Sequence, residues 1–184
     1  LGIISGTAAT AIYGVGSQIN QYYMALSTSI SGVFTPQINR IVARGEGDEQ
    51  LTRLFTRVGR IQFMLLMLVL TGFVFVGKPF ICAWGGEEYG AAYWIALLLI
   101  APVTVPLIQN IGIEIQRAKN MHQFRSKVYF CMAIGNALVS IPLGMKFGGI
   151  GCALGTAISM VVGNGFIMNW YYQTHIGLDM RYFW

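Results

Sequence analysis

The sequence predicts an all-α membrane protein, a polytopic bundle of about five full transmembrane helices plus the end of a sixth. Hydrophobic residues make up 55% of the 184 residues and charged residues only 10%, whereas about a quarter of a soluble domain is charged. The charges are clustered. The segments between them are long enough for membrane helices, which need about 20 residues. Their apolar runs are continuous rather than alternating, which argues against the strands of a membrane barrel.

The expected spans follow one another with short polar connections. The first uncharged stretch is too long for one span, so residues 1–8 are interpreted as the end of a preceding helix. A long helix is then expected over 9–38, ending near Pro36. We expect residues 1–184 to form a single transmembrane domain cut from a longer chain, because both ends lie in apolar sequence. The later spans are expected at 56–81, 91–114, 124–146 and 149–172.

Basic residues alternate in number along the successive connections. They number five, one, four, one and one, which is the alternation that the positive-inside rule requires. We therefore place the loops at 39–55 and 115–123 in the cytoplasm, together with the C-terminal end of the chain. The net charge of +5 comes from these connections and does not indicate a nucleic-acid partner.

The first of these loops is expected to contain a basic helix. Asp48 follows a glycine-rich break and is the expected N-cap, and Arg53, Arg57 and Arg60 fall along one side of the helix. One interpretation is that these arginines set the topology and reach anionic lipid head groups. The other is that they bind a pyrophosphate, since guanidinium groups bind phosphate in a bidentate manner.

Polar residues form a stripe along the first full span. They recur at steps of three and four residues, so they share one side of the helix. Two interpretations stay open, namely hydrogen bonds to neighbouring helices and the wall of an aqueous cavity that holds substrate. The stripe consists of Ser17, Asn20, Gln21, Ser27, Thr28, Ser31 and Thr35.

The span at 91–114 contains two prolines and ends in polar residues. Pro102 and Pro106 each remove a backbone hydrogen bond and favour a kink. Glu114 can pair with Arg117 at a spacing of three, or it can couple transport to an ion, because carboxylates near a membrane interior are costly. Two further candidates for the substrate cavity precede this pair, Gln109 and Asn110.

The last span carries a small-residue face. Gly151, Gly155, Ser159 and Gly163 recur every four residues, a spacing that favours close packing of membrane helices. Elsewhere, the three cysteines show no metal-ligand spacing, and the sequence has no P-loop, nucleophile elbow or paired carboxylates. From these residues we therefore expect no enzyme activity, no metal and no cofactor.

Five ordered segments together resemble bacterial oligosaccharide flippases, the polysaccharide-biosynthesis branch of the multidrug/oligosaccharidyl-lipid/polysaccharide exporter superfamily. The resemblance covers essentially the whole chain. The segments are Phe34-Thr-Pro36-Gln-Ile-Asn39, Val58-Gly-Arg60-Ile-Gln62-Phe63, Trp84-Gly-Gly-Glu-Glu-Tyr89, Gln109-Asn110-Ile-Gly-Ile-Glu114-Ile-Gln116-Arg117-Ala-Lys119-Asn120 and Gly148-Gly149-Ile-Gly151-Cys-Ala-Leu-Gly155-Thr156.

This resemblance implies a transporter of about twelve to fourteen helices in two pseudo-symmetric bundles, of which this chain is most of the C-terminal one. The N-terminal bundle is its missing partner. The implied activity is movement of undecaprenyl-pyrophosphate-linked oligosaccharide across the bacterial plasma membrane by alternating access, with H⁺ or Na⁺ as the candidate coupling ion. Capsule, O-antigen and other polysaccharides of the cell envelope are built from such oligosaccharides. The polar stripe at 9–38 then lines the central cavity.

Three other functions stay open. An ion-coupled multidrug antiporter of the same superfamily should carry an acidic residue in the middle of the membrane, and no predicted mid-membrane position here is acidic. A membrane-embedded polysaccharide polymerase should have a large external loop, and the expected external loops are short. A structural membrane scaffold requires neither an acidic residue in the middle of the membrane nor a large external loop.

Overall fold

The computed structural model describes residues 2–45, 47–121 and 123–184. Throughout these residues the secondary structure is helical, without a strand, so the predicted all-α membrane bundle is confirmed. Leu1 of the expected leading segment, Glu46 of the first expected loop and His122 of the second lie outside the described residues.

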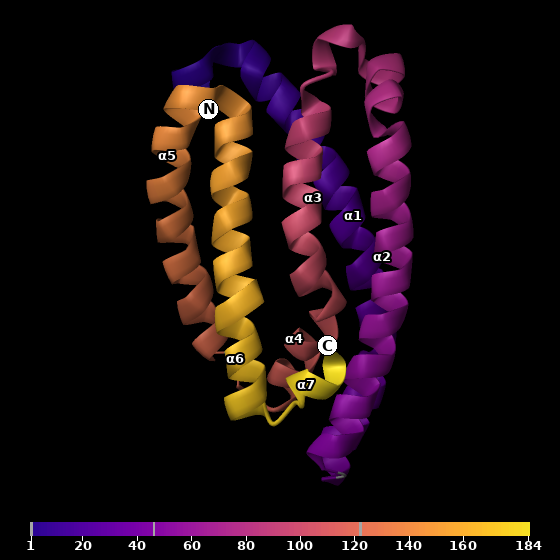
Figure 1. Cartoon of the computed structure of the whole chain (residues 1–184). Coiled ribbons are helices and arrows are strands. Elements are labelled where there is room, and N and C mark those ends of the chain that lie inside the picture. Colours follow the sequence, from indigo (N-terminus) through magenta and orange to yellow (C-terminus); the bar gives the residue numbers. More distant parts are fainter. Residues whose placement is uncertain (1, 46, 122) are drawn as a thin grey trace.

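Two long helices lie along one side of the bundle, and the start of the first crosses over its top (Figure 1). Helix α1 spans Gly2–Arg44 and helix α2 spans Asp48–Gly85. The turn between them contains Gly45 at φ 64° and Gly47 at φ 88°. Glycine adopts these values without the steric cost that a Cβ would add.

Helix α1 is longer at both ends than the sequence predicts. Residues 2–8 are its first turns rather than the end of a separate helix. The prediction that it ends near Pro36 is also wrong, because it continues to Arg44. The proline only leaves the Gly32 carbonyl without its helical partner. Beyond it, Ile38 and Ile41 are buried in the core, and this packing holds the last turns in helical form.

The expected third span is two helices with a break between them. Helix α3 spans Ala92–Ile108 and helix α4 spans Asn110–Ala118. They are separated by Gln109, which has φ −103° and ψ 12°. The break follows the second of the two prolines that predicted a kink. A short 3₁₀ turn η1, Glu87–Tyr89, connects α2 to α3.

Helix α5, Gln123–Met160, is a hairpin of two arms. It reverses at Gly148, which has φ 59° and ψ −136°, and Figure 1 shows the arms side by side. The predicted small-residue face packs against the first arm, since a Cβ at Gly151, Gly155 or Gly163 would collide with it. The elements after the second arm are the π-helical segment η2 (Val161–Met168), α6 (Asn169–Tyr171), the π-helical segment η3 (Tyr172–Ile176) and α7 (Met180–Phe183).

Three helical stretches of the described chain are long and apolar enough to cross a membrane, namely Asp48–Gly85, Glu87–Ile108 and Gln123–Ile176. The third folds back on itself at Gly148. Helix α1 is long enough but not among them, because its polar stripe lowers its mean hydropathy. The expectation of five full spans stays a prediction.

The connections alternate between the two ends of the bundle. The turn after α1, the connection between α4 and α5, and α7 lie at one end, and η1 and the α5 reversal lie at the other (Figure 1). The arginine-rich segments therefore share one end, here called the basic end, as the alternation of charge predicts. That this end faces the cytoplasm stays a prediction.

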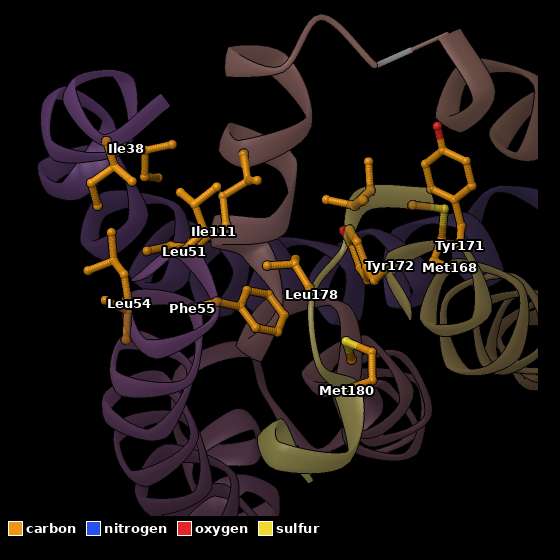
Figure 2. Packing of buried hydrophobic residues seen from close by; sticks show 14 of the residues in the cluster. Ile38, Leu51, Leu54, Phe55, Ile111, Met168, Tyr171, Tyr172, Leu178 and Met180 are labelled. Atoms are coloured by element: carbon orange, nitrogen blue, oxygen red, sulfur yellow. The ribbon is translucent and has the colours of Figure 1, made fainter. Parts of the chain in front are cut away.

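The largest core cluster lies near the basic end (Figure 2). It joins Ile38 of α1, Phe55 of α2, Ile111 of α4 and Tyr172 of η3, and each of these is at most 3% exposed. The ring of Phe55 lies near Leu178 of the chain after η3 (Figure 2). Because hydrophobic residues on both sides of the α1–α2 turn belong to this cluster, the helices extend into the expected loop at 39–55.

One lysine side chain joins three segments of the chain at the basic end. Lys119 Nζ contacts Asp48 Oδ1 at the start of α2 and donates to the carbonyl of Ile176 at 2.8 Å. The prediction that Asp48 caps α2 is wrong, because Gly47 is the N-cap and Asp48 is the first helical residue. Its carboxylate is held by a lysine distant in sequence, and local capping rules do not take that into account.

Candidate functional site

The polar stripe of α1 divides into a buried part and an open part. In the buried part, Gln62 Nε2 of α2 donates to Ser31 Oγ at 2.8 Å and to Ser27 Oγ at 3.0 Å. Ser27 Oγ donates to the carbonyl of Leu107 in α3 at 2.8 Å. The interpretation as hydrogen bonding between helices therefore applies to Ser27 and Ser31, whose hydroxyls join α1, α2 and α3.

A second polar link lies in the same interface. Tyr23 OH lies 2.8 Å from Thr104 Oγ1 and 3.2 Å from the Leu66 carbonyl. Sequence reasoning did not single out Tyr23, Thr104 or Gln62 as polar contacts. Gln62 had a recognisable signal, because a lone amide in an otherwise apolar span needs a polar partner in the membrane.

The open part of the stripe is less covered by the other helices, and its Thr35 end reaches α4. Gln21 and Thr28 are exposed, and Ser17 and Thr35 are half-buried. At 100° per residue, these four side chains fall within about 40° of one another around α1. Thr28 Oγ1 donates to the Ala25 carbonyl at 3.0 Å, and its two lone pairs remain on the open face. We call Ser17, Gln21, Thr28 and Thr35 the open polar face.

Asn20 lies on the same side of α1 as Ser27 and Ser31, within about 20° of each around the helix. Its side chain is half-buried and Nδ2 lies 3.7 Å from the sulfur of Met24. Its Oδ1 atom is buried without a hydrogen-bond partner among the described residues. The side chain therefore contributes to neither the buried seam nor the open polar face.

A charged pair stands at the end of the open polar face. Arg117 Nη1 lies 2.8 Å from Glu114 Oε1, and the two side chains are 66% and 18% exposed. Thr35 Oγ1 donates to Glu114 Oε2 at 3.4 Å. The carboxylate thus connects α4 to α1, and the Arg117 guanidinium is left accessible beside the polar face.

The other two cavity candidates are buried. Gln109 is 2% exposed, and its Nε2 donates to Asn169 Oδ1 of α6 at 2.7 Å. Asn110 is 8% exposed at the start of α4. The Gln109 amide therefore bonds to α6, and the structure does not bring it to the open polar face.

Arg60 lines a separate groove of about 630 Å³ at the basic end. Arg53 and Arg57 line it too, with Gln37 of α1. Arg53 pairs with Glu49, and both side chains are largely exposed. Gln37 lies about 160° around α1 from Gln21. The arginine groove and the open polar face are therefore on different sides of α1.

Within the described ranges, no group of three or more histidine, cysteine, aspartate or glutamate side chains is arranged to hold a metal ion. The three cysteines are free thiols. The open polar face presents hydroxyls and one amide, and the accessible Arg117 lies at its end.

The chain is similar to a protein described as a probable flippase, AglR, from Haloferax volcanii. The two are 26% identical over 169 residues, which cover 89% of this chain and 35% of the relative. No family model matches the chain, and no solved structure matches it. The chain is thus an all-α membrane protein similar to a flippase, and it spans about a third of that relative's length.

Proposed function

We propose that this chain belongs to a flippase that moves an undecaprenyl-pyrophosphate-linked oligosaccharide across the bacterial plasma membrane. The likeness to a probable flippase supports the transporter class. The observation that carries the substrate assignment is the open polar face of α1, which runs along a helix without a charged residue before Arg40.

The chemistry of the substrate explains why such a face is needed. A sugar–pyrophosphate head group loses its hydrogen bonds to water if it enters hydrocarbon alone, at a cost of several kcal/mol for each unpaired group. The hydroxyls and amide of the open polar face can replace that water. The lipid tail of the substrate stays in the bilayer and needs no polar partner.

The charged pair at the end of this face suits the pyrophosphate. The Arg117 guanidinium can donate two parallel hydrogen bonds to phosphate oxygens. Glu114 keeps that guanidinium in place and is our candidate for the ion-coupling carboxylate, with H⁺ or Na⁺ as the ion. Alternating access then exposes the polar face to one side of the membrane at a time.

The rest of the transporter supplies the opposite wall. An N-terminal bundle is our proposed partner for the open polar face, since a polar helix face in a membrane needs protein or water against it. We propose that the basic end and the C-terminal end of the chain face the cytoplasm, following the positive-inside rule.

A multidrug antiporter of the same superfamily is the second candidate. One observation favours it, namely that the Glu114 side chain is 82% covered yet bonded by only one arginine and one threonine among the described residues. Such a carboxylate can exchange a proton for a cationic drug. Drug resistance without any effect on surface polysaccharide would support this candidate.

The test uses the full-length gene in a bacterium that lacks its own flippase. We expect restored surface polysaccharide, and we expect its loss with Gln21→Leu combined with Thr28→Val. The matched control is Gln18→Leu with Ser29→Val, which changes exposed polar residues about 60–80° further around α1. Equal surface polysaccharide in the two double variants would overturn the assignment of the open polar face.

A further inference from the structure

An apolar groove of about 460 Å³ lies between the two arms of the α5 hairpin. Glycine at position 135 leaves space there, because a Cβ on Gly135 would have no heavy atom within 4 Å. The groove lies on a part of the bundle that holds none of the open polar face of α1. Its apolar lining includes Val128, Val139, Ile158, Val162 and Ile167.

One end of this groove is polar and positively charged. Lys127 and Phe124 line both the apolar groove and a neighbouring polar pocket of about 330 Å³. This second pocket is also lined by Asn120, Met121, Gln123 and Tyr171. Lys127 is exposed and takes part in none of the ion pairs formed by described residues. The apolar groove therefore opens beside a cation that has no ion-pair partner among the described residues.

The length of the groove matches one leaflet of a bilayer. Lys127 and Val139 are 12 positions apart on the first arm, which is about 18 Å along an α-helix. Half of a hydrocarbon core of about 30 Å is about 15 Å. With Lys127 near the membrane surface, the groove reaches about the depth that one acyl chain occupies.

We propose that this groove is a binding site for one anionic phospholipid. One acyl chain lies between the arms of α5, and the phosphate lies beside Lys127. The charge of Lys127 selects an anionic head group, and the neighbouring exposed amides of Asn120 and Gln123 can donate to phosphate and glycerol oxygens. This site is independent of the transported substrate, because it shares no residue with the open polar face or with the Glu114–Arg117 pair.

Native mass spectrometry of the full-length protein tests the site. The protein is mixed with equal amounts of phosphatidylglycerol and phosphatidylcholine that carry the same acyl chains. We expect a preference of about fivefold for phosphatidylglycerol, which corresponds to the about 1 kcal/mol of one lysine near an anionic lipid. Lys127→Gln should remove the preference, whereas Lys146→Gln, an exposed lysine at the far end of the same arm, should retain it.

A second pair of variants tests the acyl-chain part of the groove. Gly135→Leu should fill the groove and lower retention of both lipids severalfold. Gly72→Leu is the matched control, because Gly72 is an equally open glycine on α2 that lines no part of the groove. Equal retention of the two lipids by the unmodified protein, or equal retention by the two leucine variants, would overturn the proposal. Displacement of phosphatidylglycerol by an equal amount of a polyprenyl phosphate would also overturn it, by assigning the groove to a carrier lipid.

Discussion

Gln62 of α2 donates to Ser31 of α1 at 2.8 Å, and both side chains are at most 3% exposed. The same amide nitrogen also donates to Ser27, which in turn reaches a carbonyl of α3. One glutamine therefore organises the meeting point of three helices in the middle of the apolar bundle.

We predict that Gln62→Leu lowers the free energy of unfolding by about 1–2 kcal/mol, because hydrogen bonds between membrane helices are worth about 0.6–2 kcal/mol. Ser31→Ala should lower it by less, since Gln62 keeps its bonds to Ser27. A double-mutant cycle by chemical unfolding in detergent measures the coupling. Additive effects of the two changes would show that the 2.8 Å contact contributes nothing to stability.

The second prediction concerns two glycines with positive φ. Gly177, at φ 82°, lies where a Cβ would overlap the Asp48 carboxylate, whereas Gly45, at φ 64°, has open space around it. Both alanine variants carry the backbone cost of about 1–2 kcal/mol. Gly177→Ala should cost more because it also displaces the partner of Lys119. Thermal unfolding of the two variants gives the comparison, and equal melting temperatures would contradict it.

The third prediction uses two glycines of the α5 hairpin. Gly155→Ala should destabilise the protein, since the added Cβ would collide with Ser140 of the opposite arm. Gly135→Ala should instead stabilise it by about 0.5–1 kcal/mol, because alanine favours a helix and the site is open. Opposite shifts in melting temperature are therefore expected. Stabilisation by both changes would mean that the arms do not pack as closely as the structure shows, and destabilisation by both would mean that the site of Gly135 is not open.

The fourth prediction separates the transport role of Glu114 from its role in stability. Glu114→Gln should abolish or strongly reduce transport of lipid-linked oligosaccharide in proteoliposomes. It should change stability by about 1 kcal/mol or less, because its partner Arg117 is largely exposed. Glu49→Gln, which breaks the exposed pair with Arg53, is the control and should leave transport intact. Full transport by Glu114→Gln would exclude this carboxylate as the coupling group.

The fold class and the alternation of the connections could be predicted because both depend on local composition. Long uncharged segments predict membrane helices whatever their neighbours are. Distant contacts are harder to predict. Asp48 looked like an N-cap, but Lys119 is 71 positions away, and nothing near Asp48 in the sequence indicates that partner.

The candidate site shows the same limit. Helical periodicity places Gln21, Thr28 and Ser31 on one side of α1, but it does not say where a neighbouring helix begins. Ser31 lies about 80° from Gln21 around the helix, and that rotation is enough to bury it against Gln62. The division of the stripe into a buried and an open part therefore depends on how α2 and α3 pack, which the sequence of α1 does not contain.

The break at Gln109 divides one expected membrane span into two helices, α3 and α4, which are joined by a single residue. More than half of the residues of α3 are buried, and so are more than half of those of α4. The short α4 carries Glu114 and Arg117 beside α1. In an uninterrupted helix, the continuous ladder of backbone hydrogen bonds keeps the two ends in a fixed relative orientation. With the ladder interrupted at Gln109, the orientation of the charged pair depends on how α4 itself packs, through the buried Ile111 and Ile115, and not on the direction of α3.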